Sequence, residues 1–219
     1  MSSYYFTNNI IMDFEKIAQS ALDAPSRAQQ KRTELVQLLE LLSHLSPREI
    51  LEIGVLKGGT IKAWTNIAKD DATIIGIDLP GGSYGGGFTE TESQNIKSLA
   101  RNEQQINLFA VDSHDQTTLD NIVKPYSDKV GGIDFLFIDA DHTYEGAKID
   151  FEMYSPLVKV GGIIALHDIV KHTHYPEVEV YKLWEEIKTD YPEYKIKEFI
   201  DLDYPTDHGY WGGIGVIIV

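Results

Sequence analysis

The sequence predicts a doubly wound α/β fold with a mostly parallel sheet, and three features of the 219-residue chain indicate it. Short apolar strands alternate with helices from about residue 50 to residue 191, the order typical of a parallel sheet. The first strand leads through glycines into a helix, which is how such folds open a ligand site. The chain closes on a strand, a loop and a strand, a pair that is most simply antiparallel.

The elements follow in order along the chain. Helices are expected at 11–22 and 29–45, the second with leucines on one face and a stop at Ser46-Pro47. Strands are expected at 50–53, 72–79, 106–111, 133–138, 163–166, 194–200 and 212–219. The helices between them are expected at 60–68, 92–104, 116–126, 144–157 and 178–191. No stretch has linker composition, so we expect one domain over 1–219, with a helical extension at 1–47 and a core at 48–219. The extension is compatible with packing on the sheet edge, covering a ligand site, or pairing with a second copy in a homo-oligomer.

Composition narrows the class of partner. The net charge is −15, so nucleic acid and anionic membrane surfaces are not expected partners, whereas a small molecule is compatible. No apolar run is long enough to span a bilayer, and residues 1–9 lack the pattern of a signal peptide. The chain has no cysteine, which excludes disulfides and thiolate metal sites. A cytoplasmic location is the expectation.

The turn after the first strand reads Ile-Leu-Glu-Ile-Gly-Val-Leu-Lys-Gly-Gly-Thr over residues 50–60. Glycines at Gly54, Gly58 and Gly59 allow a tight turn and a close approach of the backbone to a ligand. Glu52 precedes them, and a carboxylate suits a cationic ligand group better than a pyrophosphate. With this acid the stretch resembles motif I of the class I S-adenosylmethionine-dependent methyltransferases. The plain alternative is an ordinary glycine turn of an α/β protein.

Asp78 ends the next strand, about 20 residues beyond the glycine turn, where Rossmann-type folds bind ribose hydroxyls. An aspartate here is also a common turn or helix cap. The following segment, 80–91, holds five glycines between Gly81 and Gly87. It is interpreted either as a loop over the cofactor or acceptor, or as a plain surface loop.

Polar groups follow each of the first five expected strands of the core. In open α/β sheets ligands bind at the carboxyl ends of the strands, so these groups are expected to converge on one crevice. The groups are Glu52, Asp78, Asp112-Ser113, Asp139 to His142, and His167-Asp168.

The stretch Ile-Asp-Phe-Leu-Phe-Ile-Asp-Ala-Asp-His-Thr-Tyr-Glu-Gly, followed by a helix, a glycine pair and Leu-His-Asp, carries a closer resemblance. It is similar to small-molecule O-methyltransferases that include the macrocin and mycinamicin sugar methyltransferases and the cephalosporin-hydroxylase-like proteins. The similarity covers about 50–169. It implies a Rossmann-like methyltransferase fold with a seven-stranded sheet, an antiparallel last strand and helices on both faces. It further implies S-adenosylmethionine as cofactor, often Mg²⁺ or another divalent metal, and a small-molecule acceptor.

The resemblance also implies roles for individual residues. The cofactor's methionine end would be held by Glu52, Gly54, Gly58 and Thr60, its ribose by Asp78, and its adenine by Asp112 and Ser113. Asp139 would border the cofactor and ligate a metal, with Asp168 as second ligand and His142 as general base. The chain departs from the metal-dependent pattern at His167, where several relatives have an acid. Because Mg²⁺ prefers oxygen ligands, either the metal differs, or His167 does not ligate, or no metal binds.

The chemistry of methyl transfer agrees with these roles. An alcohol is a poor nucleophile until its proton is removed, and a histidine can accept that proton near neutral pH. We expect Asp139 and Asp168 at metal-bridging distance on neighbouring strands, with His142 in the same cavity. Two alternatives stay open: a nicotinamide-dependent oxidoreductase, and a non-catalytic binding protein on a methyltransferase scaffold. His172, His174 and His208 are weaker candidates for substrate contact.

Overall fold

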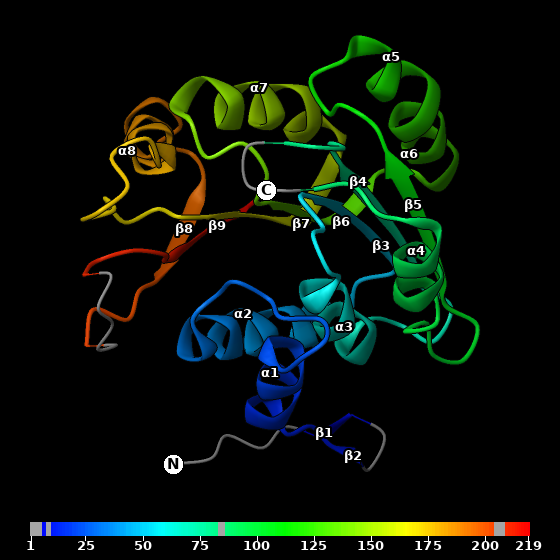
Figure 1. The fold of residues 1–219 in the computed structure, drawn as a ribbon. Helices are drawn as coiled ribbons and strands as arrows, with labels where there is room; N and C mark the ends of the chain where they lie inside the picture. Colours follow the sequence, from blue (N-terminus) through cyan, green and yellow to red (C-terminus); the bar gives the residue numbers. More distant parts are fainter. Residues whose placement is uncertain (1–5, 8–9, 83–85, 204–208) are drawn as a thin grey trace.

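A seven-stranded sheet forms the centre of the computed structural model, which describes residues 6–7, 10–82, 86–203 and 209–219. His208 and residues 83–85 of the glycine-rich loop lie outside this described part. The strand order is β5–β4–β3–β6–β7–β9–β8, and only β9 runs antiparallel to its neighbours (Figure 1). The strands are β3 Glu49–Ile53, β4 Thr73–Asp78, β5 Gln105–Ala110, β6 Ile133–Ile138, β7 Val158–His167, β8 Lys195–Phe199 and β9 Ile214–Ile218. The predicted fold class, a mostly parallel seven-stranded sheet with an antiparallel last strand, is confirmed.

The register brings the strands of the predicted site together. β3 lies between β4 and β6, with Ile53 opposite both Ile77 and Ile138. β6 in turn pairs with β7, with Ile138 opposite Leu166. The carboxyl ends of β4, β3, β6 and β7 are therefore consecutive along one edge of the sheet.

Helices cover both faces of the sheet (Figure 1). One face carries α1 Phe14–Leu22, α2 Arg32–Leu45 and α3 Gly59–Ile67, and the other carries α6 Lys124–Val130, α7 Tyr144–Tyr154 and α8 Val180–Asp190. Two short helices, α4 Glu90–Lys97 and α5 Gln116–Thr118, follow β4 and β5. A π-helical turn, Leu119–Val123, joins α5 to α6 where one continuous helix was predicted.

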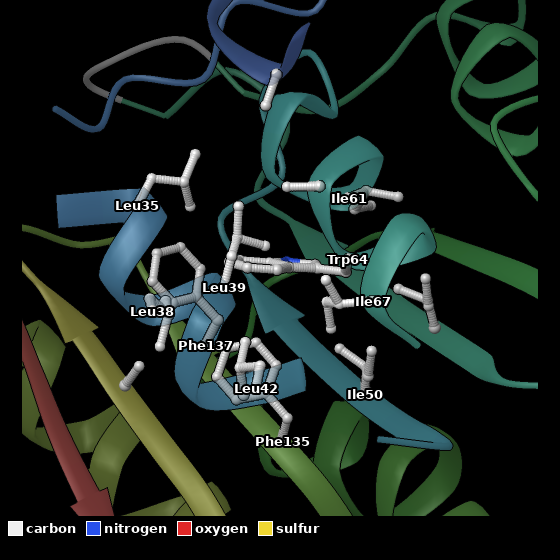
Figure 2. Close-up of a cluster of buried hydrophobic side chains, with 14 of the residues drawn as sticks. Leu35, Leu38, Leu39, Leu42, Ile50, Ile61, Trp64, Ile67, Phe135 and Phe137 are labelled. Carbon is white, nitrogen blue, oxygen red and sulfur yellow. The ribbon is translucent and has the colours of Figure 1, made fainter. Parts of the chain in front are cut away.

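Trp64 is the centre of the first core layer, and its side chain is fully buried (Figure 2). Its ring meets Phe135 edge-on at 5.1 Å between centroids, and Phe137 at 5.4 Å. Leucines 35, 38, 39 and 42 of α2 pack on the same cluster. The leucine face expected for 29–45 is therefore the face that joins the N-terminal extension to the sheet.

Several helices and strands begin or end at other residues than the sequence predicts. Residues 10–11 pair with 6–7 in a small antiparallel hairpin, β1 Phe6–Thr7 and β2 Ile10–Ile11, so α1 starts only at Phe14. Asp13 sets this start, because its side chain accepts the backbone N–H of Lys16 at 3.1 Å. The helix expected at 92–104 runs from Glu90 to Lys97, opened by a capping box between Thr89 and Glu92. The glycine pair at 161–162 lies inside β7 rather than ahead of it. Within the described residues, no helix combines the length and apolar character that crossing a membrane requires.

Candidate active site

Asp139, His142 and Asp168 form the centre of the site at the ends of β6 and β7. One ligand atom from each lies within 4.8 Å of the others. Nδ1 of His142 is 2.8 Å from Oδ2 of Asp168. In the sequence, Asp168 lies 26 residues after His142 and 29 after Asp139. The fold brings these three side chains together, as expected from neighbouring strand ends.

The contact between His142 and Asp168 defines how the imidazole is oriented. An ionised carboxylate only accepts hydrogen bonds, so Nδ1 of His142 is the donor and Nε2 is the atom left to exchange a proton. Burial lowers the pKa of His142, but the carboxylates of Asp168 and Asp139 outweigh it, and the net shift is upward. Burial likewise acts to raise the pKa of Asp168, but His167 and His142 hold it low, at about 2.

His167 lies behind the two carboxylates. Its Nδ1 is 3.2 Å from Oδ1 of Asp139 and 3.5 Å from Oδ1 of Asp168. Burial opposes its charge, but these carboxylates raise the pKa of His167 to about 10. The two carboxylates therefore favour the protonated form of His167, and His167 is not part of the group whose atoms converge as metal donors.

Asp168 has a strained backbone. Its φ of +62° lies in the left-handed region, which few residues other than glycine adopt. It is buried, with 6% of its surface exposed. Backbone strain of this kind clusters at functional sites, where the surrounding structure holds it in place.

The donors in this cluster fit a divalent cation. Two carboxylates and one imidazole nitrogen converge within the range of one ion. The two carboxylates suit a hard cation such as Mg²⁺ or Mn²⁺, whereas an imidazole donor would favour a later transition metal. The chemistry of the donors thus permits a metal at Asp139 and Asp168, two of the three predicted metal positions, whereas the third, His167, is not in the converging group.

The glycines of the turn after β3 have packing reasons of their own. A Cβ on Gly54 would lie 2.0 Å from the carbonyl oxygen of Asp139, and one on Gly59 would lie 2.3 Å from the backbone nitrogen of Ala28. A Cβ on Gly58 would meet the side chain of Ile96 at 2.8 Å, and Gly58 has a φ of +76°. The turn is therefore pressed between β6, α4 and the N-terminal segment, and these glycines do not by themselves indicate a ligand.

Glu52 lies beneath the turn rather than on its surface. Its carboxylate is fully buried and accepts hydrogen bonds from the hydroxyl of Thr60 and, at 2.8 Å, from Nε1 of Trp64. Burial raises the pKa of Glu52 to about 8, although these two donors act in the opposite direction. Glu52 and Thr60, both predicted to hold the cofactor, are thus bonded to each other and join β3 to α3.

Asp78 ties two loops together at the end of β4. Its Oδ2 accepts the backbone N–H groups of Val55 and Leu56, at 2.8 and 2.6 Å, and its Oδ1 accepts that of Gly87 at 2.6 Å. An open cleft of about 510 Å³ adjoins it, a size typical of small-ligand sites. The cleft is lined by residues that include Leu56, Lys57, Pro80, Gly86, Gly87 and Phe88.

Asp112 and Ser113 follow β5 at the far end of the site. Asp112 is exposed and caps its own turn by accepting the backbone N–H of His114 at 2.9 Å. Ser113 is buried, and its carbonyl accepts the hydroxyl of Tyr154 at 2.7 Å. His174 is exposed, and His172 accepts the backbone N–H groups of residues 174 and 175, outside the Asp139 cluster.

The N-terminal segment supplies a residue that the sequence analysis missed. Nε2 of Gln30 donates to Oδ2 of Asp139 at 2.6 Å, across 109 residues of sequence. Two neighbours of Gln30 are also buried: Lys31 at 2% and Glu34 at 0% exposure. Such charges are rarely buried without a partner, but their burial is a property of the fold, so the sequence carried no signal that pointed to Gln30.

Comparisons with known proteins identify the family to which the chain belongs. A family model described as a methyltransferase domain matches residues 51–169, from β3 through the residue after Asp168. Caffeoyl-CoA O-methyltransferase from Stellaria longipes is 30% identical over 131 residues, which are 59% of this chain and 49% of that protein. The chain thus matches about half the length of this curated relative.

Solved structures share the fold at low identity. TomG, an O-methyltransferase from Streptomyces achromogenes solved with SAM, has a TM-score of 0.60 at 16% identity, over 99% of this chain and 92% of its own. MycE, a methyltransferase of mycinamycin biosynthesis solved with Mg, SAH and mycinamycin VI, has a TM-score of 0.59 at 16% identity, over 94% of this chain and 54% of its own. With the family model covering more than half of its residues, the chain belongs to the methyltransferase-domain family.

Proposed function

We propose that this chain transfers a methyl group from S-adenosylmethionine to a hydroxyl of a small molecule, with His142 as general base. One observation carries the proposal: His142 is held by Asp168 at 2.8 Å, beside the glycine turn of a methyltransferase-family fold. A histidine oriented by a carboxylate is the arrangement that general-base catalysis uses. A sugar or other natural product is the acceptor class that the sequence resemblance favours.

The proton follows a defined route. When bound, S-adenosylmethionine supplies a methyl carbon on a sulfonium sulfur, which leaves with the electron pair of the broken C–S bond. Nε2 of His142 takes the hydroxyl proton as the acceptor oxygen bonds to that carbon. Asp168 stabilises the imidazolium that results, because its Oδ2 already accepts the Nδ1 proton.

The cofactor would lie along the carboxyl edge of the sheet. Its methionine end would meet the glycine turn and the first N–H groups of α3, which suit a carboxylate. Glu52, through Thr60 and Trp64, would support this turn from below. The ribose would lie near Asp78 and the adjoining cleft, and the adenine near Asp112 and Ser113. SAM and SAH in the solved relatives support this choice of cofactor.

A divalent cation would be held by Asp139 and Asp168. Such an ion would supply Lewis acidity, which lowers the pKa of an acceptor hydroxyl held in the site. The Mg in the MycE structure supports this assignment, as does the convergence of donor atoms in this chain. His142 would then act as the base that takes the proton from the acceptor hydroxyl.

The experiment is methyl transfer from SAM to a panel of hydroxylated small molecules, comparing the wild type with His142→Ala. We expect turnover to fall about 10²–10⁴-fold while SAH affinity is kept, since His142 acts on the proton rather than on the cofactor. His174→Ala is the matched control, because His174 is exposed and lies outside the Asp139 cluster. Equal turnover in the wild type and His142→Ala would reject the base. Cofactor binding without turnover over a broad panel would favour the non-catalytic alternative.

A further inference from the structure

Of the two polar atoms in the side-chain amide of Gln30, only the nitrogen has a hydrogen-bond partner among the described residues. Its side chain is 4% exposed, and Nε2 donates to Oδ2 of Asp139 at 2.6 Å. Oε1, on the same carbon, is buried and has no hydrogen-bond partner among the described residues. A buried carbonyl without a partner costs about 1–3 kcal/mol, so a group bound in the site is the natural partner for it.

The contacts of the two carboxylates show on which side a bound group would lie. Both Oδ1 atoms, of Asp139 and Asp168, face Nδ1 of His167. The Oδ2 atom of Asp139 faces Gln30, and that of Asp168 faces His142. Gln30 and His142 therefore flank the side of the carboxylate pair that is turned away from His167.

Gln30 is held in this position by the residues that follow it. Nζ of Lys31 donates to the carbonyl of Asp201 at 2.6 Å, and the hydroxyl of Thr33 donates to the Asp201 side chain at 2.5 Å. Glu34 accepts the backbone N–H groups of Asp201 and Gly213, at 2.9 and 3.0 Å. These four bonds fix the start of α2 against the loops that border β8 and β9.

The segment before Gln30 is fixed as well. The backbone nitrogen of Ala28 donates to the carbonyl of Ala21 at 2.9 Å. Nζ of Lys62 donates to the carbonyl of Ser20 at 2.8 Å. Gly59 leaves room for this segment, since any Cβ there would collide with Ala28. The chain is thus fixed on both sides of Gln30. The segment before it lies over the start of α3, and the segment after it is bonded to the loops at 201 and 213.

We propose that the carbonyl oxygen of Gln30 is a ligand of the divalent cation held by Asp139 and Asp168. This deepens the metal site of the proposed function and rests on it. The imidazole of His167 is engaged by both carboxylates and is not among the converging donors. Gln30 adds an oxygen to the donor set from another part of the chain, and it does so without a further negative charge. Amide oxygens are ordinary ligands of hard divalent cations.

Mn²⁺ is the probe, titrated by calorimetry and by the loss of the free-ion electron paramagnetic resonance signal. We expect Gln30→Ala to weaken Mn²⁺ binding by about 10–100-fold, the range seen when groups around a metal site are removed. Gln29→Ala is the matched control, since Gln29 is adjacent and exposed, and should bind as the wild type does. Circular dichroism of each variant checks that it is folded.

Gln30→Glu separates a ligand from a hydrogen-bond donor. A glutamate keeps an oxygen for the cation but cannot donate to Asp139, so a ligand role predicts Mn²⁺ affinity at or above that of the wild type. A donor role alone predicts a loss equal to that of Gln30→Ala, and this result would overturn the proposal. Equal affinity of Gln30→Ala and the wild type would overturn it too, as would a wild type that binds no Mn²⁺.

SAH titrated into the same preparations keeps the two proposals apart. If SAH binds the folded wild type while the Mn²⁺ results above fail, the ligand role of Gln30 is wrong and the methyltransferase proposal stands. If SAH does not bind, the proposed function fails, whatever the Mn²⁺ titration gives.

Discussion

At the scale of single residues, Glu52 shows how a predicted ligand-binding acid can also be structural. Its carboxyl group is fully buried between β3 and α3, and its two oxygens are hydrogen-bonded to Thr60 and Trp64 of α3. A carboxylate removed from water is disfavoured in its charged form, and burial raises the pKa of Glu52 to about 8. The free energy of unfolding must then depend on the protonation of this one group.

We expect Glu52→Gln to change how stability depends on pH. Glu52 keeps its proton in the folded state up to about pH 8, whereas in the unfolded chain it loses it near pH 4.5. The unfolded state thus binds fewer protons between these values, so the contribution of Glu52 to stability is full below pH 4.5 and is lost as pH rises to about 8. A glutamine can accept from Trp64 and donate to Thr60, and it does not ionise.

Denaturant unfolding at several pH values checks this prediction. The stability of Glu52→Gln relative to the wild type should rise between pH 5 and pH 8, by on the order of 3 kcal/mol. A difference that stays constant over this range would mean that Glu52 is charged in the folded protein.

The residues of the cluster that follow strands could be predicted from the sequence, whereas Gln30, which does not follow a strand, could not. Asp139, His142 and Asp168 could be predicted because strand ends of a parallel sheet meet along one edge. Gln30 lies 109 residues from Asp139 and reaches it only because α2 packs on α3 and the sheet. No local pattern encodes that contact, since it depends on where a whole helix is placed.

At the scale of elements, α2 has two functions on two faces. Its leucines pack on the core around Trp64, which the apolar spacing predicted. Its first turn carries Glu34, which binds the backbone of the loops at 201 and 213 and pairs with Lys31 at 3.6 Å. We infer from this that the N-terminal extension and the core form one folding unit.

Glu34→Ala should lower the free energy of unfolding by about 3 kcal/mol. The change leaves Lys31 without its buried partner carboxylate and leaves two backbone N–H groups without an acceptor. Gln37→Ala, on the same helix and exposed, should change stability by less than about 0.5 kcal/mol. Chemical denaturation measures both, and equal effects of the two substitutions would show that the contacts of Glu34 with Lys31 and with the loops at 201 and 213 contribute little.

At the scale of the whole molecule, the site depends on close contact between the ends of β3 and β6. Gly54 and Asp139, which follow these strands, are 85 residues apart in the sequence. Gly54, after β3, and Asp139, after β6, are so close that a Cβ on the glycine would lie 2.0 Å from the Asp139 carbonyl oxygen. The backbone of the glycine turn is therefore packed directly against the backbone of Asp139. That β6 and β7 are neighbours could be predicted from the sequence, but a distance of this kind could not.

Gly54→Ala should destabilise the protein far more than Gly161→Ala does. Both glycines have positive φ, +92° and +83°, but a Cβ on Gly161 meets nothing within 4 Å. Gly161→Ala thus measures backbone strain alone, about 1 kcal/mol, whereas Gly54→Ala adds a backbone collision on the order of 3 kcal/mol or more. Thermal melting of both variants tests this, and similar melting temperatures would mean that β3 and β6 can separate at this point.

The most direct test of the central claim is a calorimetric titration of the folded wild-type protein with S-adenosylhomocysteine, with NAD titrated under the same conditions. The methyltransferase account predicts saturable binding of S-adenosylhomocysteine in the micromolar range and none of NAD. Saturable binding of NAD, with no heat from S-adenosylhomocysteine at high micromolar concentration, would contradict it.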